Sequence, residues 1–229
     1  MLPGATFEAI TGTPPLEPGE IHVWHVAWPR TMPPRAVSAA TRGEVLCRLM
    51  AYAGLAAPPR IESGAHGKPV VPDVPGIEFN ISHSGTDVLV AFARQQPLGI
   101  DIESLDRPRT TIDGIAERFF AKAEAAALAR LPALIRQRAF IALWTHKEAI
   151  LKATGEGISS GLDRVEFSID ESGGIGELVS LPLGFGRRED WRFLAFAPAA
   201  ALIAALAWQG PPRPVRGFVA APRPELRHG

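Results

Sequence analysis

Apolar residues in the first half of the chain fall into short runs that are typical of strands. Four such runs predict strands, and they span residues 21–28 (IHVWHVAW), 78–82 (EFNIS), 87–94 (DVLVAFAR) and 98–103 (LGIDIE). After the first of them, apolar residues recur at helical spacing over residues 36–55, which predicts a helix that stops near Gly54. The Gly/Pro-rich residues 62–76 are too broken for a helix.

The pattern changes toward helix in the second half of the chain. The expected elements are helices over residues 112–131 and 134–154, a strand over residues 165–169 (VEFSI), and a hairpin over residues 191–197 and 201–208. Pro132 ends the first of these helices and Gly155 closes the second. Each half of the chain therefore offers helical material and about three strands, and the change falls near residues 104–112.

These patterns divide the chain into four parts. We expect a loose lead over residues 1–20, an N-terminal α/β half over residues 21–108 and a C-terminal α/β half over residues 109–209. A Pro/Arg-rich tail, expected to be poorly ordered, follows over residues 210–229.

Charge and cysteine content narrow the functional classes. The 24 basic and 24 acidic side chains cancel, and this balance counts against nonspecific binding to nucleic acid or to anionic membranes, because both need a cationic surface. The single cysteine, Cys47, excludes an internal disulfide and any zinc or iron–sulfur site built from several cysteines.

Targeting and membrane segments are not expected. The N-terminus has neither the cationic start nor the long apolar run of a signal peptide. The longest apolar stretch, residues 193–208, is shorter than the roughly 20 residues of a bilayer span, and Pro198 interrupts it. We therefore expect a cytoplasmic protein that contacts no membrane.

Two carboxylates share one face of the predicted strand at residues 98–103. Asp101 and Glu103 flank Ile102, and side chains alternate along a strand, so both acids point the same way. Two like charges about 7 Å apart favour a bound divalent cation, and oxygen ligands suit Mg²⁺. The alternative is an exposed face that carries two solvated acids, and this motif alone does not decide between them.

A lysine interrupts the apolar stripe of the predicted helix at residues 134–154. The stripe consists of Phe140, Leu143, Trp144, Lys147 and Leu151. Glu148 and Lys152 lie at its edge, one turn apart. They form either an ordinary i,i+4 ion pair worth about 0.2–0.5 kcal/mol, or a third carboxylate for the cation with an ammonium beside it for phosphate. Spacing alone leaves both interpretations open.

Hydrogen-bonding groups gather where the strand at residues 78–82 ends. The stretch FNISHSG at 79–85 holds an amide, two hydroxyls and an imidazole, from Asn80, Ser82, Ser84 and His83. Such a cluster can bind an anion, and upstream Lys68 and Pro69 put a cation on a turn. The alternative is an ordinary Ser/Thr turn. No histidine has metal-ligand spacing, and the sequence has no nucleophile elbow, P-loop or dinucleotide fingerprint.

Five motifs, taken in order, resemble one family. They are GKP at 67–69, FNISHSG at 79–85, LGIDIE at 98–103, RFFAKAE at 118–124 and LWTHKEAILKATGEGIS at 143–159. The series resembles the 4′-phosphopantetheinyl transferases, specifically the larger, surfactin-synthetase-activating (Sfp-type) branch. The resemblance implies an α+β fold in a pseudo-twofold arrangement of two similar halves, each a small antiparallel sheet packed on helices. Coenzyme A is then expected in the cleft between the halves.

The resemblance also implies a reaction and its partners. The family moves 4′-phosphopantetheine from coenzyme A to a serine of an acyl or peptidyl carrier protein, uses Mg²⁺, and releases adenosine 3′,5′-bisphosphate. Because 229 residues can form both halves of the cleft in one chain, we expect a monomer rather than the smaller trimeric type of synthase.

Each candidate residue takes a role by this resemblance. Asp101, Glu103 and Glu148 are expected to hold Mg²⁺ against the diphosphate. Lys152 is expected to contact the same phosphates, and Glu148, directly or through a metal-bound water, is the candidate base for the carrier serine. The expected coenzyme A contacts are Lys68, Pro69, Ser82, His83, Lys147 and Lys152.

One part of the expected site departs from the family. The first helix usually supplies basic and hydroxyl groups for the 3′-phosphate of coenzyme A, but Ala39 and Ala40 stand where such groups are expected here. The candidate substitutes are Thr41, Arg42, Arg30 and Arg35.

Two other hypotheses use the same residues. A metal-dependent phosphohydrolase would release phosphate from coenzyme A or nucleotides without a carrier. A module that only binds coenzyme A or a carrier would leave the carrier unchanged, although the joint presence of Asp101, Glu103, Glu148 and Lys152 argues against it.

Overall fold

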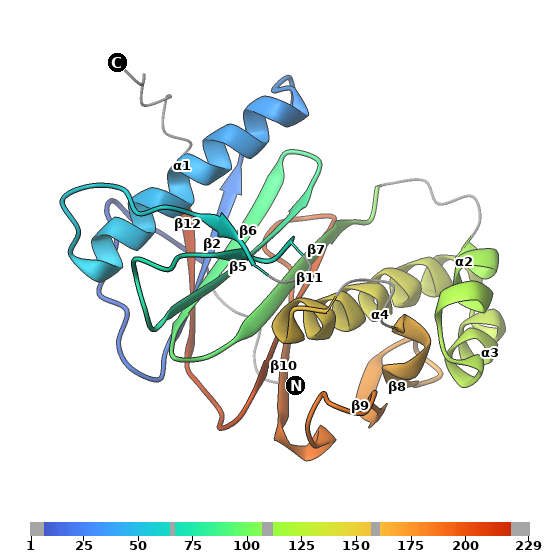
Figure 1. Cartoon of the computed structure of the whole chain (residues 1–229). Coiled ribbons are helices and arrows are strands. Elements are labelled where there is room, and N and C mark those ends of the chain that lie inside the picture. Colours follow the sequence, from blue (N-terminus) through green and yellow to red (C-terminus); the bar gives the residue numbers. More distant parts are fainter. Residues whose placement is uncertain (1–6, 65–66, 107–111, 157–160, 221–229) are drawn as a thin grey trace.

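Two β-sheets pack face to face, and α-helices cover their outer faces. The computed structural model describes residues 7–64, 67–106, 112–156 and 161–220. The first sheet has the strand order β1 (Phe7–Ala9), β12 (Val215–Ala220), β2 (Ile21–Ala27), β6 (Asp87–Arg94) and β5 (Ile77–Ser84). The second has the order β10 (Trp191–Phe196), β11 (Leu202–Gln209) and β7 (Leu98–Ser104). Figure 1 shows the arrangement.

The helices lie on opposite sides of this pair of sheets. Helix α1 (Pro34–Ala53) lies against the first sheet, and α4 (Ala133–Thr154) against the second (Figure 1). The remaining described elements are α2 (Ile112–Phe119), α3 (Lys122–Arg130), the 3₁₀ turns η3 (Leu162–Arg164) and η4 (Arg188–Asp190), and the short strands β3 (Glu62–Ser63), β4 (Pro69–Val70), β8 (Glu166–Ile169) and β9 (Ile175–Ser180).

Three hydrophobic layers explain the long apolar runs of the central strands. In β6, Val88, Val90 and Phe92 pack toward α1. The alternate residues Leu89, Ala91 and Ala93 pack against the second sheet. In β11, likewise, residues 202, 204 and 206 face the first sheet while residues 203, 205 and 207 face α4. Because both faces of these strands are buried, both sets of alternating positions must be apolar.

Most of the predicted elements are present. The strands expected at 21–28, 78–82, 87–94 and 98–103 correspond to β2, β5, β6 and β7, and the expected hairpin is β10 and β11. The helices expected over 36–55 and 134–154 correspond to α1 and α4. The α+β class is therefore confirmed.

The single helix predicted over residues 112–131 is wrong, because the chain forms two helices there. It leaves helical conformation at Phe120 and Ala121, between α2 and α3. Phe120 is buried and stacks near Phe140, with ring centroids 5.1 Å apart. The carboxylate of Glu124 accepts a hydrogen bond from the backbone N–H of Ala121 at 2.9 Å and so fixes the start of α3.

The strands do not follow the predicted division of the chain. Strand β7, expected in the N-terminal half, pairs with β11 of the second sheet. Strand β12 falls in the predicted poorly ordered tail but lies between β1 and β2, parallel to both. Strand β1 and the buried Leu16 likewise show that residues 7–20 are not a loose lead. Residues 1–6 and 221–229 lie outside the described residues.

The two sheets also differ from the expected pair of antiparallel sheets. The second sheet is antiparallel throughout its described strands. The first is mixed, since β12 pairs in parallel with β1 and β2 while β2, β6 and β5 are antiparallel. The pseudo-twofold relation between the halves stays a prediction.

None of the helices in the described part of the chain combines the length and the apolar character that crossing a bilayer requires.

Strand β7 lies unusually close to the backbone of α4. A Cβ atom added at Gly99 would lie 2.0 Å from the carbonyl oxygen of Ala149 and 2.4 Å from the backbone nitrogen of Ala153. These neighbours are helix backbone and cannot move aside as a side chain could. The residue at position 99 must therefore lack a side chain for the strand and the helix to pack as they do.

We predict that Gly99→Ala destabilises the fold, at the upper end of the about 1–3 kcal/mol that overpacking usually costs, because α4 must shift away from β7. The matched control is Gly43→Ala in α1, where an added Cβ meets nothing within 4 Å. That variant should be more stable by about 0.5–1 kcal/mol, since alanine favours helix over glycine. Urea denaturation followed by circular dichroism measures both, and equal stability of the two variants would contradict the close approach.

Candidate active site

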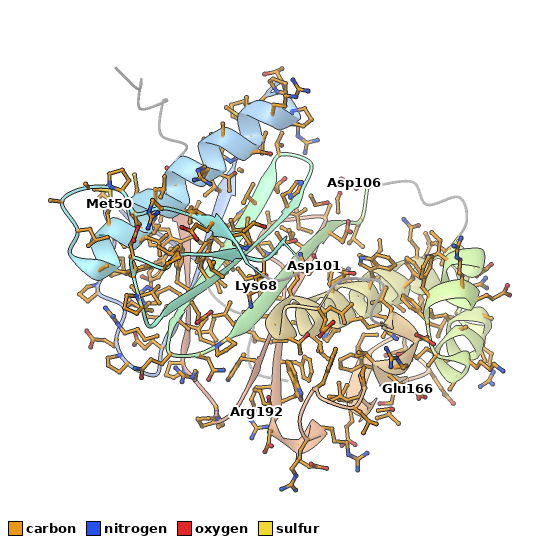
Figure 2. All side chains as sticks on the ribbon, viewed as in Figure 1. Met50, Lys68, Asp101, Asp106, Glu166 and Arg192 are labelled. Atoms are coloured by element: carbon orange, nitrogen blue, oxygen red, sulfur yellow. The ribbon has the colours of Figure 1, made fainter. Side chains whose placement is uncertain are left out.

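Polar side chains meet where β5, β7 and α4 come together. Figure 2 labels Lys68 and Asp101 in this region, between the side of the molecule that carries α1 and the side that carries α4. The ammonium of Lys68 reaches the carbonyl oxygens of Leu98 and Ala153 at 3.5 and 3.4 Å. It thus links the segment before β5 to the start of β7 and to the end of α4.

A ladder of side-chain hydrogen bonds joins β5 to β7. The amide oxygen of Asn80 accepts from the N–H of Ile100 at 2.9 Å. The hydroxyls of Ser82 and Ser84 accept from the N–H groups of residues 102 and 104 at 3.3 and 3.0 Å. These three side chains share one face of β5 because they are two residues apart. They accept hydrogen bonds from backbone N–H groups of β7 on the side where β7 has no neighbouring strand.

One acid and one lysine form a close pair beside this ladder. The Nζ of Lys152 lies 2.7 Å from Oδ1 of Asp101 and 2.9 Å from the hydroxyl of Ser82. The same Oδ1 accepts a hydrogen bond from that hydroxyl at 2.8 Å. Asp101 is 5% exposed, so its charge is offset by a bonded ammonium rather than by bulk water.

Two carboxylate oxygens at the site have no hydrogen-bond partner among the described residues. They are Oδ2 of Asp101 and Oε1 of Glu148, and both are buried. Burial, followed by the nearby charge of Asp101, raises the pKa of Glu148 to about 7, while Lys152 opposes the shift and Glu103 adds to it. The buried carboxylates therefore repel one another, and one lysine does not fully compensate them.

These oxygens fit the donor set of a hard divalent cation. Such a cation prefers carboxylate oxygens and would satisfy both orphaned atoms. Within the described ranges, no group of three His, Cys, Asp or Glu side chains is already drawn together as a set of metal ligands. The unpartnered oxygens and the mutual repulsion at Glu148 are what a cation would relieve, so the residues fit Mg²⁺.

A pocket of about 220 Å³ opens on the other face of β5, toward α1. Its wall is largely apolar, and it includes His83, Pro69, Thr41 and Arg42. His83 points there because it alternates with the ladder residues along β5. Thr41 and Arg42, two of the four candidates for the 3′-phosphate, thus lie together with two of the expected coenzyme A contacts.

A second pocket, of about 360 Å³, lies beyond the ladder. It is lined by Arg30, Ser84, Ser104 and Asp106, among others. Arg30 therefore belongs to a different pocket from Arg42, and Arg35 lines neither. The three candidate metal ligands line neither pocket, but the hydroxyl of Ser84 lies 3.4 Å from Glu103 and so connects the second pocket to them.

Comparison with known proteins identifies part of the chain. Residues 97–207 match the model of the 4′-phosphopantetheinyl transferase superfamily. They begin one residue before β7, end within β11, and include α4. Residues 97–207 are therefore similar to a 4′-phosphopantetheinyl transferase domain, and we call them the matched segment.

Individual relatives agree with this assignment. The 4′-phosphopantetheinyl transferase psf-1 of Bacillus pumilus is 42% identical over 135 residues, which cover 57% of this chain and 56% of the relative. Sfp of Bacillus subtilis (strain 168) is 37% identical over 123 residues, covering 54% and 52%. HetI of Nostoc is 34% identical over 153 residues, covering 63% and 60%. The chain thus spans about half the length of the curated relatives it matches.

The matched segment holds Lys147 away from the site. Its ammonium is fully buried, lies 2.5 Å from a carboxylate oxygen of Glu124, and donates to the carbonyl oxygens of Leu162 and Val165. The other oxygen of Glu124 accepts from the N–H of Phe167 at 2.8 Å. The expected contact between Lys147 and coenzyme A does not fit this placement. The lysine instead ties together α3, α4, η3 and β8.

Two residues that matter to the structure of the matched segment have no role predicted from the sequence. Gly99 precedes the paired acids, and a glycine inside a strand is itself a signal of close backbone approach. Glu124 ends the RFFAKAE motif, but nothing in the spacing indicates that it pairs with Lys147 23 residues later.

We predict that Lys147→Met lowers the free energy of unfolding by about 3–5 kcal/mol, because it leaves Glu124 buried without its counter-ion. The control is Lys122→Met, which removes an exposed lysine at the start of α3 and should leave stability nearly unchanged. Chemical denaturation measures the difference. A Lys147→Met protein that is as stable as the control, and that loses only affinity for coenzyme A, would restore the lysine to the ligand site.

Proposed function

We propose that this chain transfers the 4′-phosphopantetheine group of coenzyme A to a serine of an acyl or peptidyl carrier protein and releases adenosine 3′,5′-bisphosphate. The observation that carries the proposal is the pair of buried, unpartnered oxygens of Asp101 and Glu148 beside Lys152, inside the segment that matches the transferase superfamily. A site that concentrates carboxylates next to one ammonium is suited to a substrate that brings both a cation and a diphosphate.

The pocket between α1 and β5 is the proposed binding site for the adenosine end of coenzyme A. Its apolar wall suits a base, and Pro69 and His83 line it. Arg42 supplies the cation for the 3′-phosphate, in place of the groups that Ala39 and Ala40 lack. Lys68 and Lys152 lie at the far side of β5, where the diphosphate would follow.

Asp101, Glu103 and Glu148 are the residues that would hold Mg²⁺. The cation, when bound, neutralises diphosphate charge and makes the departing phosphate a better leaving group. Lys152 adds a second positive charge at the same place through an ammonium that is partly exposed and so accessible to substrate.

The protein's own part in the chemistry is to take a proton and to orient the substrate. The carboxylate of Glu148 accepts the proton of the carrier serine hydroxyl, and the serine oxygen then forms a bond to the phosphorus that bears pantetheine. The bond from that phosphorus to the bridging oxygen breaks, and adenosine 3′,5′-bisphosphate leaves with the electron pair. Lys152 stabilises the negative charge that develops on the phosphates.

The assembly follows from the same argument. Both sheets and all proposed ligand-binding residues come from one chain, so we propose a monomer with two similar halves, acting in the cytoplasm on a soluble carrier protein.

Mass spectrometry of an apo carrier protein tests the function. The carrier should gain one phosphopantetheine group only when the chain, coenzyme A and Mg²⁺ are all present. Asp101→Ala and Glu148→Ala should abolish the gain, because each removes a carboxylate that would hold the cation. Lys152→Ala should slow it by about 10²-fold, because it removes a positive charge that acts on the diphosphate.

The control for this assay is Glu177→Gln, which changes an exposed acid on β9 and should keep full activity. Circular dichroism checks that each variant is folded. Phosphate released without a carrier would indicate a phosphohydrolase instead, and bound coenzyme A with an unchanged carrier mass would indicate a binding module.

We predict that Arg42→Ala raises the KM for coenzyme A about tenfold but leaves the KM for 3′-dephospho-coenzyme A unchanged, because one charged hydrogen bond to phosphate is lost. Arg35→Ala is the matched control, since Arg35 also lies on α1 but does not line the pocket. If Arg35→Ala shows the selective effect and Arg42→Ala does not, the 3′-phosphate is bound elsewhere.

A further inference from the structure

A chain of side-chain hydrogen bonds links the core beneath α1 to the segment before β2. The indole N–H of Trp24 donates to the hydroxyl of Tyr52 at 2.8 Å, and that hydroxyl lies 2.9 Å from Nδ1 of His22. Nε2 of the same imidazole lies 3.3 Å from a carboxylate oxygen of Glu20. Trp24 and His22 are on β2, and Tyr52 is in the last turn of α1, so the chain fastens the end of the helix to the first sheet.

Aromatic rings enclose the middle of this chain. His22 has no exposed surface, and Phe218 of β12 lies edge-on to it with ring centroids 5.0 Å apart. Phe92 of β6 lies in the same way against Tyr52, at 5.2 Å. A buried polar group that loses its hydrogen bond costs free energy, because no water replaces the partner. The donors and acceptors of the chain must therefore be satisfied within the protein.

Donor and acceptor roles assign the hydrogens along the chain. An indole nitrogen can only donate, so the oxygen of Tyr52 accepts from Trp24. The hydroxyl then has its own hydrogen to donate, and Nδ1 of His22 is the acceptor that it meets. An ionised carboxylate only accepts, so the hydrogen of the imidazole belongs on Nε2, toward Glu20. One neutral tautomer of His22 thus satisfies every group in the chain.

The surroundings of His22 favour its neutral form. Burial has the largest influence and lowers the pKa of His22 below the ordinary value of 6.5. Glu20 opposes this shift, whereas Arg216, which pairs with His22 across β12 and β2, adds to it. The imidazole is therefore neutral at pH 7 and can accept from Tyr52.

Two further cations lie at the Tyr52 end of the chain. The guanidinium of Arg48, which pairs with Glu44, lies over the ring of Trp24 with its Cζ 3.6 Å from the ring centroid. Arg94 donates to the carbonyl oxygen of Tyr52 at 2.9 Å. Burial raises the pKa of Tyr52, so its hydroxyl stays a hydrogen-bond donor throughout the neutral and acid range.

We propose that the hydrogen bond from Tyr52 to His22 is an acid-sensitive latch, which holds the last turn of α1 on the first sheet. A protonated imidazole carries hydrogen on both nitrogens, so Nδ1 can no longer accept from Tyr52. Two donors then face each other, and the buried hydroxyl has lost its acceptor. Acidification therefore weakens the attachment of this end of the helix. The inference does not depend on the function proposed above.

The sign of the pH dependence follows from the two states of His22. The unfolded chain takes up a proton at His22 near pH 6.5, whereas the folded protein takes it up only at a lower pH. In that window the unfolded state binds more protons, so stability falls as the pH falls. Burial also lowers the pKa of His146 on α4, which acts in the same direction. Only a difference between variants therefore isolates the latch.

Nitrogen-15 NMR of the histidine side chains in the full chain tests the latch directly. At neutral pH, His22 should be the tautomer that carries hydrogen on Nε2, and its titration midpoint should lie below 6.5. The indole N–H signal of Trp24 should shift with the same midpoint, because Trp24 and His22 share the hydroxyl of Tyr52.

Urea denaturation between pH 7 and pH 5 tests the consequence for stability. The denaturation midpoint of the unaltered protein should fall with pH. Tyr52→Phe has no hydroxyl to lose its acceptor, so its midpoint should fall less. His22→Asn should also fall less, because its amide oxygen can accept from Tyr52 and does not titrate.

Two results would overturn the proposal. Hydrogen on Nδ1 of His22 at neutral pH would mean that the imidazole already donates to Tyr52, and protonation would leave that bond in place. An equal loss of stability in Tyr52→Phe and in the unaltered protein would assign the acid sensitivity to the burial of His22 alone. If His22→Asn fails to fold, the NMR tautomer and the comparison with Tyr52→Phe decide the question.

Discussion

The close approach of β7 to α4 at Gly99 is the constraint on which the candidate site depends. With hydrogen in place of a side chain, the strand lies against the helix backbone at Ala149 and Ala153. Asp101 is two residues along the strand from Gly99, and Lys152 lies on the turn of helix that the glycine contacts. Glycine therefore sets the distance at which an acid on a strand and a lysine on a helix can meet at 2.7 Å.

The ladder from β5 completes this arrangement without an ordinary strand pair. Strand β5 lies at the edge of the first sheet, and β7 at the edge of the second. Three side chains of β5 replace the backbone partners that β7 would have in a continuous sheet. Because two of those side chains, Ser82 and Ser84, carry hydroxyls, the junction also brings hydrogen-bond donors to the carboxylates. A plain backbone ladder could not do so, since its N–H groups lie in the plane of the sheet.

Local pattern predicted the elements and the grouping of acids, but not their long-range partners. The alternation in LGIDIE placed Asp101 and Glu103 on one face, and the helical spacing of Glu148 and Lys152 placed them one turn apart. The apolar stripe of α4 also showed that Lys147 is a charge on an apolar face. Its partner Glu124 lies on another helix, so the spacing could not indicate the pair. The return of β12 into the first sheet was missed for the same reason, because a pairing with β2 across nearly the whole chain leaves no local periodicity.

The proposed cation site and the proposed binding pocket for the adenosine end of coenzyme A lie in different parts of the chain. The matched residues 97–207 contain the carboxylates, Lys152 and the glycine that brings them together, and the proposed cation and diphosphate would leave little freedom in such a set. The pocket toward α1 lies outside that range. A cation for a terminal phosphate can be supplied from any position on the facing helix that reaches it. The proposed use of Arg42, which follows Ala39 and Ala40 by three and two residues on α1, is the kind of change that this freedom allows.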